Sequence, residues 1–99
     1  MNINVIHNEE KTTIVLSGRL DTTTSPKLQE ILLPEISNAE HIELDFAKLI
    51  FVSSAGLRIL LMGEKAAKTK GSRQTLVNVS PDIMEVFEIT GFSSVLNFE

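Results

Sequence analysis

The stretch Leu49-Ile50-Phe51-Val52-Ser53-Ser54-Ala55-Gly56-Leu57-Arg58 decides how this chain folds. It opens with an apolar run typical of a buried strand, which leads directly into two serines and then into residues that favour a helix. The first N–H groups of a helix are unpaired and carry partial positive charge, so a serine hydroxyl there can cap the helix or carry a phosphate. The stretch therefore predicts a strand that turns into a helix at a serine able to gain charge.

The composition around this stretch is that of an ordinary globular protein. At 99 residues the chain is long enough for one modest core, and we expect a single domain over residues 1–99. A net charge of -4 disfavours nucleic acid as a partner, because nucleic-acid phosphates require a basic face. With no cysteine and two histidines far apart in the sequence, we expect neither a metal site nor a cofactor.

The N-terminal residues 1–4 lack the basic flank and apolar core of a secretory signal. No apolar run reaches the length of about 18 residues that a membrane span needs. We therefore expect a chain without contact to the membrane and located in the cytoplasm.

Six segments have the composition or alternation of strands. In Glu40–Phe46 the residues Ile42, Leu44 and Phe46 share one face, and His41, Glu43 and Asp45 share the other, which is the period of a half-buried strand. A separate short strand is expected at Leu49–Val52. The remaining predicted strands are Ile3–His7 and Thr12–Gly18, joined by a hairpin turn, then Thr75–Val79 and Ser94–Phe98.

Three helices are expected between these strands, each with a recognisable start or end. Ser25 as N-cap and Pro26 at the first helical position predict a helix that Pro34 should kink or restart. Its inward residues would be Leu28, Ile31 and Leu32. The second helix spans about Ser54–Lys70 and is closed by Gly71, and the third begins at Ser80-Pro81-Asp82 and stops at Gly91.

The order of these elements predicts the fold class. Strands that alternate with helices, without internal repeats, indicate an α/β fold with a mixed sheet, parallel central strands and helices packed mainly on one face.

Around the Ser54–Lys70 helix, one side should pack on the sheet, and it holds Ile59, Met62, Gly63, Ala66 and Ala67. Leu57 and Leu61 fall on the opposite side with Glu64, Lys65 and Lys68, close to the serine that opens the helix. An apolar pair in that setting is a candidate contact for a partner protein. Scattered surface leucines are common, however, and first-turn residues often tuck under a loop, so both interpretations stay open.

Three motifs resemble the STAS domain family, specifically its bacterial anti-sigma factor antagonists. Val52–Arg58 resembles the family's signature, and Gly18–Asp21 resembles its G-x-L-D element at the end of the second strand. Ser80-Pro81 followed by Val86–Phe92 resembles the pattern of its third helix. The motifs occur in the family's order and at suitable spacing, and the likeness spans nearly the whole chain.

The resemblance implies a phosphorylation switch. The unmodified antagonist binds an anti-sigma factor that is also an ATP-dependent serine kinase, and this binding frees a sigma factor. Phosphorylation ends the binding, and a serine phosphatase restores the active form. Such a protein is a substrate and a ligand of enzymes and catalyses nothing itself.

The family's phosphorylated residue falls two positions before the glycine, at Ser54. Ser53 stands where the family commonly has an aspartate, which makes it a rival acceptor. The same partner surface would include Asp21, Thr22, Thr23, Thr24, Gly56, Leu57, Arg58 and Leu61. Ordinary turn and capping chemistry also accounts for the Asp-Thr-Thr-Thr-Ser run, and Arg58 could simply be solvated.

The sequence leaves one other function class open and disfavours a second. STAS-like domains also serve as scaffolds or assembly subunits without a serine switch, and this reading is the alternative. A hydrolase is improbable because the chain has no G-x-S-x-G elbow and its only imidazole bases, His7 and His41, both fall on predicted strands.

Overall fold

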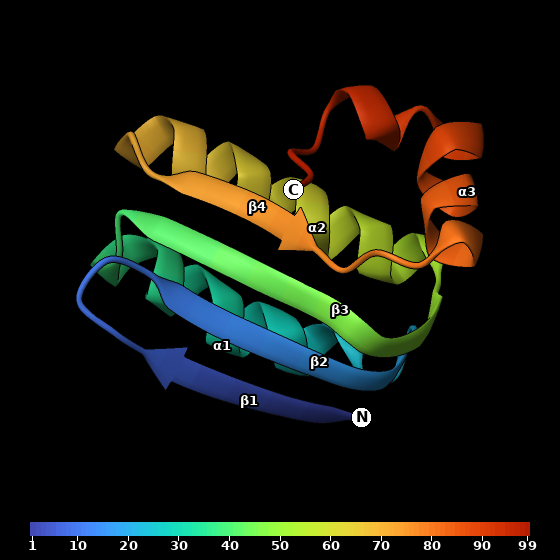
Figure 1. The fold of residues 1–99 in the computed structure, drawn as a ribbon, viewed down its shortest axis with the longest axis horizontal. Helices are drawn as coiled ribbons and strands as arrows, with labels where there is room; N and C mark the ends of the chain where they lie inside the picture. The colour runs from blue at the N-terminus through green and yellow to red at the C-terminus, as the bar shows by residue number, and fades with distance from the viewer.

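The computed structural model describes all residues, 1–99, and its centre is a four-stranded sheet in the order β1-β2-β3-β4. The strands are β1 (Asn2–His7), β2 (Thr12–Leu20), β3 (His41–Val52) and β4 (Arg73–Val77). β1 and β2 are antiparallel, whereas β2 with β3 and β3 with β4 are parallel (Figure 1). The predicted mixed sheet with parallel central strands is confirmed.

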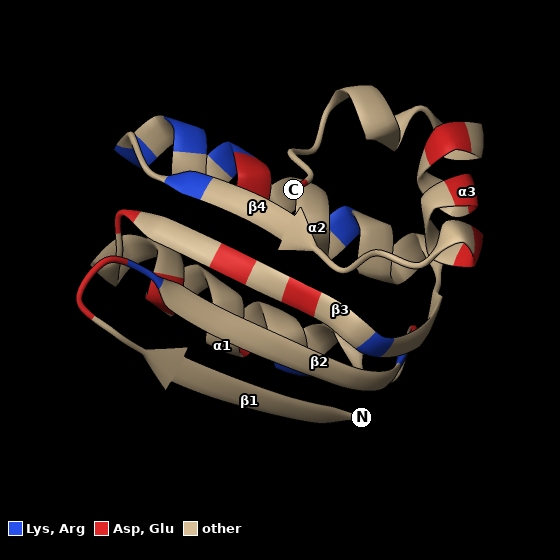
Figure 2. Cartoon of the chain, in the orientation of Figure 1, with Lys and Arg blue, Asp and Glu red and all other residues tan.

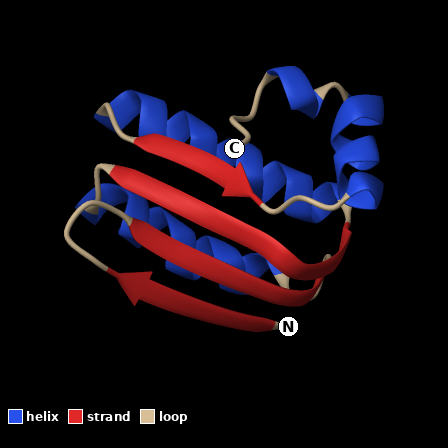
Figure 3. Ribbon diagram, in the orientation of Figure 1, coloured by secondary structure: helices blue, strands red, loops and turns tan.

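Helices α1 (Ser25–Asn38) and α2 (Ser54–Lys70) lie side by side on one face of the sheet, and α3 (Pro81–Thr90) lies at its end (Figure 3). The other face carries no helix. Between the layers, 19 buried apolar side chains form the core, Leu28 and Leu32 of α1 among them. No helix has the length and apolarity needed to cross a membrane.

The ends of α2 and α3 follow the predicted capping chemistry. Gly71 and Gly91 adopt left-handed conformations with φ of 84° and 82°, which end the two helices where glycine was expected to end them. The Ser80 hydroxyl accepts a hydrogen bond from the Ile83 N–H and caps α3.

Helix α1 differs from the prediction at two positions. Pro34 does not restart it: one helix continues through Pro34 to Asn38, and Pro34 is exposed, so water can reach the backbone around it. Thr24 rather than Ser25 occupies the N-cap, and its hydroxyl donates to the Arg19 carbonyl oxygen at 2.7 Å. Ser25 is buried, and its N–H and hydroxyl both donate to the Asp21 carbonyl oxygen.

The two strands predicted within residues 40–52 are one continuous strand, β3. Its register with β2 shifts between Val15 and Ser17 and again between Gly18 and Arg19. At each shift β3 has one residue more than β2, so the inward and outward alternation slips. The alternation of apolar and polar residues breaks between Phe46 and Leu49 because β3 contains two register shifts, not because it is two strands.

The C-terminal residues do not form the predicted strand Ser94–Phe98. After Gly91 the chain forms a 3₁₀ turn at Phe92–Ser94, so only the last residues reach the sheet. Phe98 makes a single parallel bridge with Leu76 of β4, and its ring lies 5.3 Å from that of Phe87. The fourth strand lies at Arg73–Val77, two residues earlier than predicted.

Candidate functional site

The two serines at the start of α2 have different roles. Ser53 is the N-cap in extended conformation, with its hydroxyl accepting a 3.4 Å hydrogen bond from the Gly56 N–H. Its own N–H donates to the Leu20 carbonyl oxygen at 2.9 Å, which ties the helix start to the end of β2. Ser54 is the first helical residue and is exposed. The capping function thus falls on Ser53, and Ser54 presents its hydroxyl to solvent.

Gly56 allows α2 to approach the end of β2 closely. A Cβ at this position would lie 2.7 Å from Leu20 Cγ and 3.0 Å from the Leu20 carbonyl oxygen, so any side chain would force the helix away. Gly56 is buried. It therefore positions the serines, and the prediction that it takes part in a partner surface receives no support from its location.

The prediction of an exposed apolar pair beside the serine is wrong for Leu57, whose side chain is only 5% exposed. Leu61 is half-buried, and Arg58 is exposed. Helix α2 packs against α1 as well as against the sheet, so its buried face is wider than a single-sided prediction allows. That face includes Leu57, Leu60 and even Glu64, whereas Met62 and Ala66, predicted to face the sheet, are only half-buried.

An exposed apolar pair does lie beside the serines, but on β3. Ile50 is 72% exposed and Phe51 is 37% exposed, because the register shifts turn both side chains outward. The Arg19 guanidinium lies over the Phe51 ring at 4.1 Å from its centroid. Sequence reasoning missed these residues, because an apolar run such as Leu49–Val52 is typical of a buried strand and gives no signal that two of its side chains face solvent.

The Asp21 loop lies at the end of β2, next to the start of α2. The Asp21 carboxylate accepts hydrogen bonds from the Thr23 N–H at 3.0 Å and from the Thr24 N–H at 3.1 Å. These bonds, the Thr24 N–H above all, hold the pKa of Asp21 below its ordinary value against a smaller opposing effect of desolvation. The carboxylate is therefore used to shape the loop, while Thr22 and Thr23 remain exposed.

The loop bonds predict an acid-sensitive component of stability. Because the folded-state pKa of Asp21 is lowered, the ionised carboxylate stabilises the fold above the unfolded pKa of about 3.9, and this contribution is lost as the pH falls through the folded value. Asp21→Asn keeps an acceptor oxygen but cannot titrate. Urea unfolding at a series of pH values should show a smaller loss of stability on acidification in Asp21→Asn than in the wild type. Parallel profiles would contradict the assignment.

A shallow hollow of about 280 Å³ lies between the first turns of α1 and α2. It brings Thr22 of the loop and Arg58 of α2 together, with Ile59 and Met62 among its apolar lining. Thr24, by contrast, is occupied by its bonds within the loop. The predicted site residues that reach this surface are thus Thr22 and Arg58, next to Ser54.

Charge is unevenly distributed around this end of the molecule. The first turn of α2 contains no acidic residue that would balance the positive end of the helix dipole. Helix α3, in contrast, carries Asp82, Glu85 and Glu88 (Figure 2). The start of α2 is therefore a place where the fold itself tolerates added negative charge.

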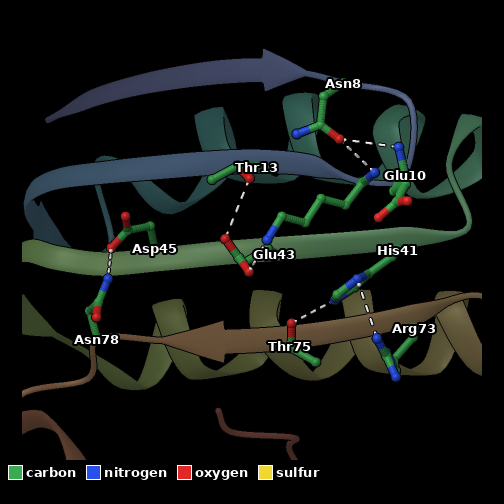
Figure 4. A network of polar contacts seen from close by, with 10 residues as sticks. Asn8, Glu10, Thr13, His41, Glu43, Asp45, Arg73, Thr75 and Asn78 are labelled. Atoms are coloured by element: carbon green, nitrogen blue, oxygen red, sulfur yellow. Dashed lines mark hydrogen bonds and ion pairs between the residues drawn. The ribbon is translucent and has the colours of Figure 1, made fainter.

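A separate polar network on the helix-free face of the sheet links neighbouring strands (Figure 4). Lys11 Nζ donates to Glu43 at 2.8 Å, and this bond raises the pKa of Lys11. His41 Nε2 lies 2.8 Å from Thr75 Oγ1, and burial, aided by the nearby Arg73, lowers the pKa of His41. No group of three or more His, Asp or Glu side chains is placed to hold a metal ion. The network joins strands and is not connected to the serines.

Comparison with known proteins agrees with this arrangement. The family model described as "Mlab, STAS domain" matches residues 3–97. BtrV of Bordetella bronchiseptica is 32% identical over 81 residues, which cover 81% of this chain and 70% of BtrV. The anti-sigma-B factor antagonist of Bacillus subtilis is 25% identical over 97 residues, which cover 98% of this chain and 89% of that protein.

Solved structures show the same fold at lower identity. The anti-sigma factor antagonist SpoIIAA in its unphosphorylated form superposes with a TM-score of 0.77 at 21% identity, over 99% of this chain and 87% of that one. SpoIIAA of Bacillus in the phosphorylated form gives a TM-score of 0.77 at 22% identity, over 99% of this chain and 91% of that one. Together with the matched residues 3–97, these findings show that the chain belongs to the STAS domain family, among the anti-sigma factor antagonists.

Proposed function

We propose that this chain is an anti-sigma factor antagonist controlled by phosphorylation of Ser54. In its unmodified form it binds an anti-sigma factor that is also a serine kinase, and a sigma factor or another effector is released. The exchange takes place in the cytoplasm, where sigma factors act. The chain serves as a ligand and a substrate in this cycle and catalyses no step itself.

The observation that carries the proposal is the division of labour between the two serines. Ser53 is the N-cap of α2, and its hydroxyl is engaged by the Gly56 N–H. Ser54 is exposed at the next position, where a kinase can reach its hydroxyl. The relative SpoIIAA has been solved in unphosphorylated and phosphorylated forms, which supports a phosphate-carrying state for this family.

The surroundings of Ser54 support a local switch. The positive end of α2 and the absence of an acidic first turn favour a phosphate within the folded chain. At an interface, however, the added charge of about -1.5 to -2 would have to be desolvated. Ile50 and Phe51, just before the serine in the chain, are exposed, and Thr22 and Arg58 line a hollow together with Ala55, so a partner could cover apolar and polar groups here. Phosphorylation would then end binding without refolding the antagonist.

The direct test is the transfer of phosphate from ATP by the candidate anti-sigma factor kinase, read by intact mass. We expect the wild type and Ser53→Ala to gain one phosphate and Ser54→Ala to gain none. Ser53→Ala should also lose roughly 1 kcal/mol of stability as a missing N-cap, which separates its structural role from that of Ser54. A serine phosphatase should remove the phosphate from both proteins that gained it.

Two outcomes would overturn the proposal. If phosphate enters Ser54→Ala but not Ser53→Ala, the acceptor is the capping serine. If a kinase that binds the wild type transfers no phosphate to it, the chain is a STAS scaffold without a serine switch.

A further inference from the structure

One edge of the sheet is not covered by any other part of the chain. At the β4 edge, the Leu76 N–H donates to the Asn97 carbonyl oxygen at 2.8 Å, and the Leu76 carbonyl oxygen accepts from the Glu99 N–H at 2.9 Å. The opposite edge is β1, which pairs only with β2 and lies at the margin of the molecule in Figure 1. The backbone of β1 therefore has hydrogen-bonding groups that no strand of this chain satisfies.

Strand β1 lacks the features that usually keep an edge strand from pairing. Its sequence, Asn-Ile-Asn-Val-Ile-His, contains no lysine, no proline and no acidic residue, and Figure 2 shows no charge along it. Its register with β2 runs without a bulge from Asn2 opposite Ser17 to His7 opposite Thr12. Ile6 is 47% exposed on this strand. A neutral edge with a regular register is suited to accept another strand.

The hairpin turn indicates which groups of β1 point outward. The Asn8 N–H donates to the Lys11 carbonyl oxygen at 3.1 Å, which makes this pair a hydrogen-bonded one. Bonded and non-bonded pairs alternate along an antiparallel ladder, so the even-numbered residues of β1 bond to β2. Ile3 and Val5 then direct their N–H and carbonyl groups away from β2.

We propose that β1 pairs antiparallel with β1 of a second copy of this chain, about a two-fold axis at Asn4. In this register Ile3 lies opposite Val5 of the other copy, and Asn4 lies opposite its own counterpart. Ile3 and Val5 are both half-buried on the helix side and contact the core, so the pairing matches apolar with apolar. Each copy contributes four strands, and the joined sheet is continuous.

Charge and side-chain alternation favour this register. A slip by one residue would place residues of the helix side opposite residues of the helix-free side, so the two faces of the joined sheet would no longer match. The acidic turn with Glu9 and Glu10 falls beyond the paired residues, at opposite ends of the two-fold arrangement. Like charges are therefore kept apart despite a net charge of -4 on each chain.

The pairing leaves the serine switch accessible. Ser54 follows β3, two strands inside the edge, and is not part of β1. Because the two sheets run in opposite directions across the axis, the two Ser54 residues lie at opposite ends of the joined sheet. Each copy could then engage a partner of its own, and the inference does not depend on Ser54 being phosphorylated.

The test uses the natural absence of cysteine. In the proposed register, Asn4 forms a non-bonded pair with its counterpart, with Cα atoms about 4.5 Å apart, which is within the range that a disulfide needs. Asn4→Cys should therefore form covalent dimers under mild oxidation at least tenfold faster than Asn2→Cys or Ile6→Cys alone. A mixture of Asn2→Cys and Ile6→Cys chains should link to each other, because these positions face one another across the axis.

A second measurement avoids cysteine altogether. Light scattering at about 100 μM should show association of the wild type, and Asn4→Lys should weaken it at least tenfold because two ammonium groups would meet at the axis. Thr69→Lys adds the same charge on the exposed surface of α2 and should leave association unchanged. Equal disulfide rates for Asn4→Cys and Asn2→Cys, or undiminished association of Asn4→Lys, would overturn the proposal.

Discussion

Ser54→Asp is expected to weaken binding to the anti-sigma factor partner by about 30-fold or more. A carboxylate at this position would be covered by the partner without a matching charge, and burying an unpaired charge costs about 2 kcal/mol or more. In the free protein, the same carboxylate lies at the positive end of α2, where it stabilises the helix by about 0.3–1 kcal/mol. The substitution should thus weaken binding and slightly stabilise the fold.

The opposite signs of these two effects make the experiment decisive. Calorimetric titration with the partner measures the affinity, and thermal unfolding of the free chain measures the stability. The asparagine in Ser54→Asn has nearly the same shape as aspartate but no charge. This variant should bind the partner with an affinity within a few-fold of the wild type. If Ser54→Asp and Ser54→Asn weaken binding equally, the shape of the side chain rather than its charge controls the interface. A tight complex with Ser54→Asp would remove the electrostatic basis of the switch.

Local features of this fold could be predicted from the sequence because their causes are local. The caps at Ser80, Gly71 and Gly91 each depend on a residue's own conformational preference, and all three lie where they were expected. The hairpin at the N-terminus and the alternation of Ile42 and Leu44 were predictable for the same reason. The caps and the hairpin join residues that are close in the chain, and the alternation reflects the two faces of a single strand.

The features that escaped prediction depend on neighbours that are distant in the chain. The outward turn of Ile50 and Phe51 follows from the register of β3 against β2, which alternation within β3 does not reveal. The burial of Leu57 follows from the packing of α2 on both α1 and the sheet. The proposal of Ser54 as the acceptor comes from a sequence motif, whereas the exposed residues near it can be found only in the structure.

The burial of Glu64 also depends on residues that are distant in the chain. Its helical position groups it with lysines, yet it is only 3% exposed. The Asn97 side-chain amide donates to the two carboxylate oxygens of Glu64 at 3.0 and 3.2 Å and to the main-chain carbonyl oxygen of Gln74 at 3.1 Å. Lys68 Nζ is farther away, at 3.7 Å, and largely exposed. Asn97 therefore provides the close contacts that satisfy a buried charge.

Asn97→Ala is accordingly expected to cost about 3 kcal/mol of unfolding free energy, because it leaves the Glu64 carboxylate buried without a close donor. Adding Glu64→Leu to this variant should restore at least about 1 kcal/mol, since an apolar side chain needs no partner. Urea denaturation of the single and double variants measures both effects, and Asn38→Ala, at an exposed asparagine, is the matched control. If the second substitution adds a further loss, the bonds to Asn97 are not what keeps Glu64 inside, and the C-terminal segment is held by the packing of Leu96 and Phe98 and by its backbone bonds to Leu76.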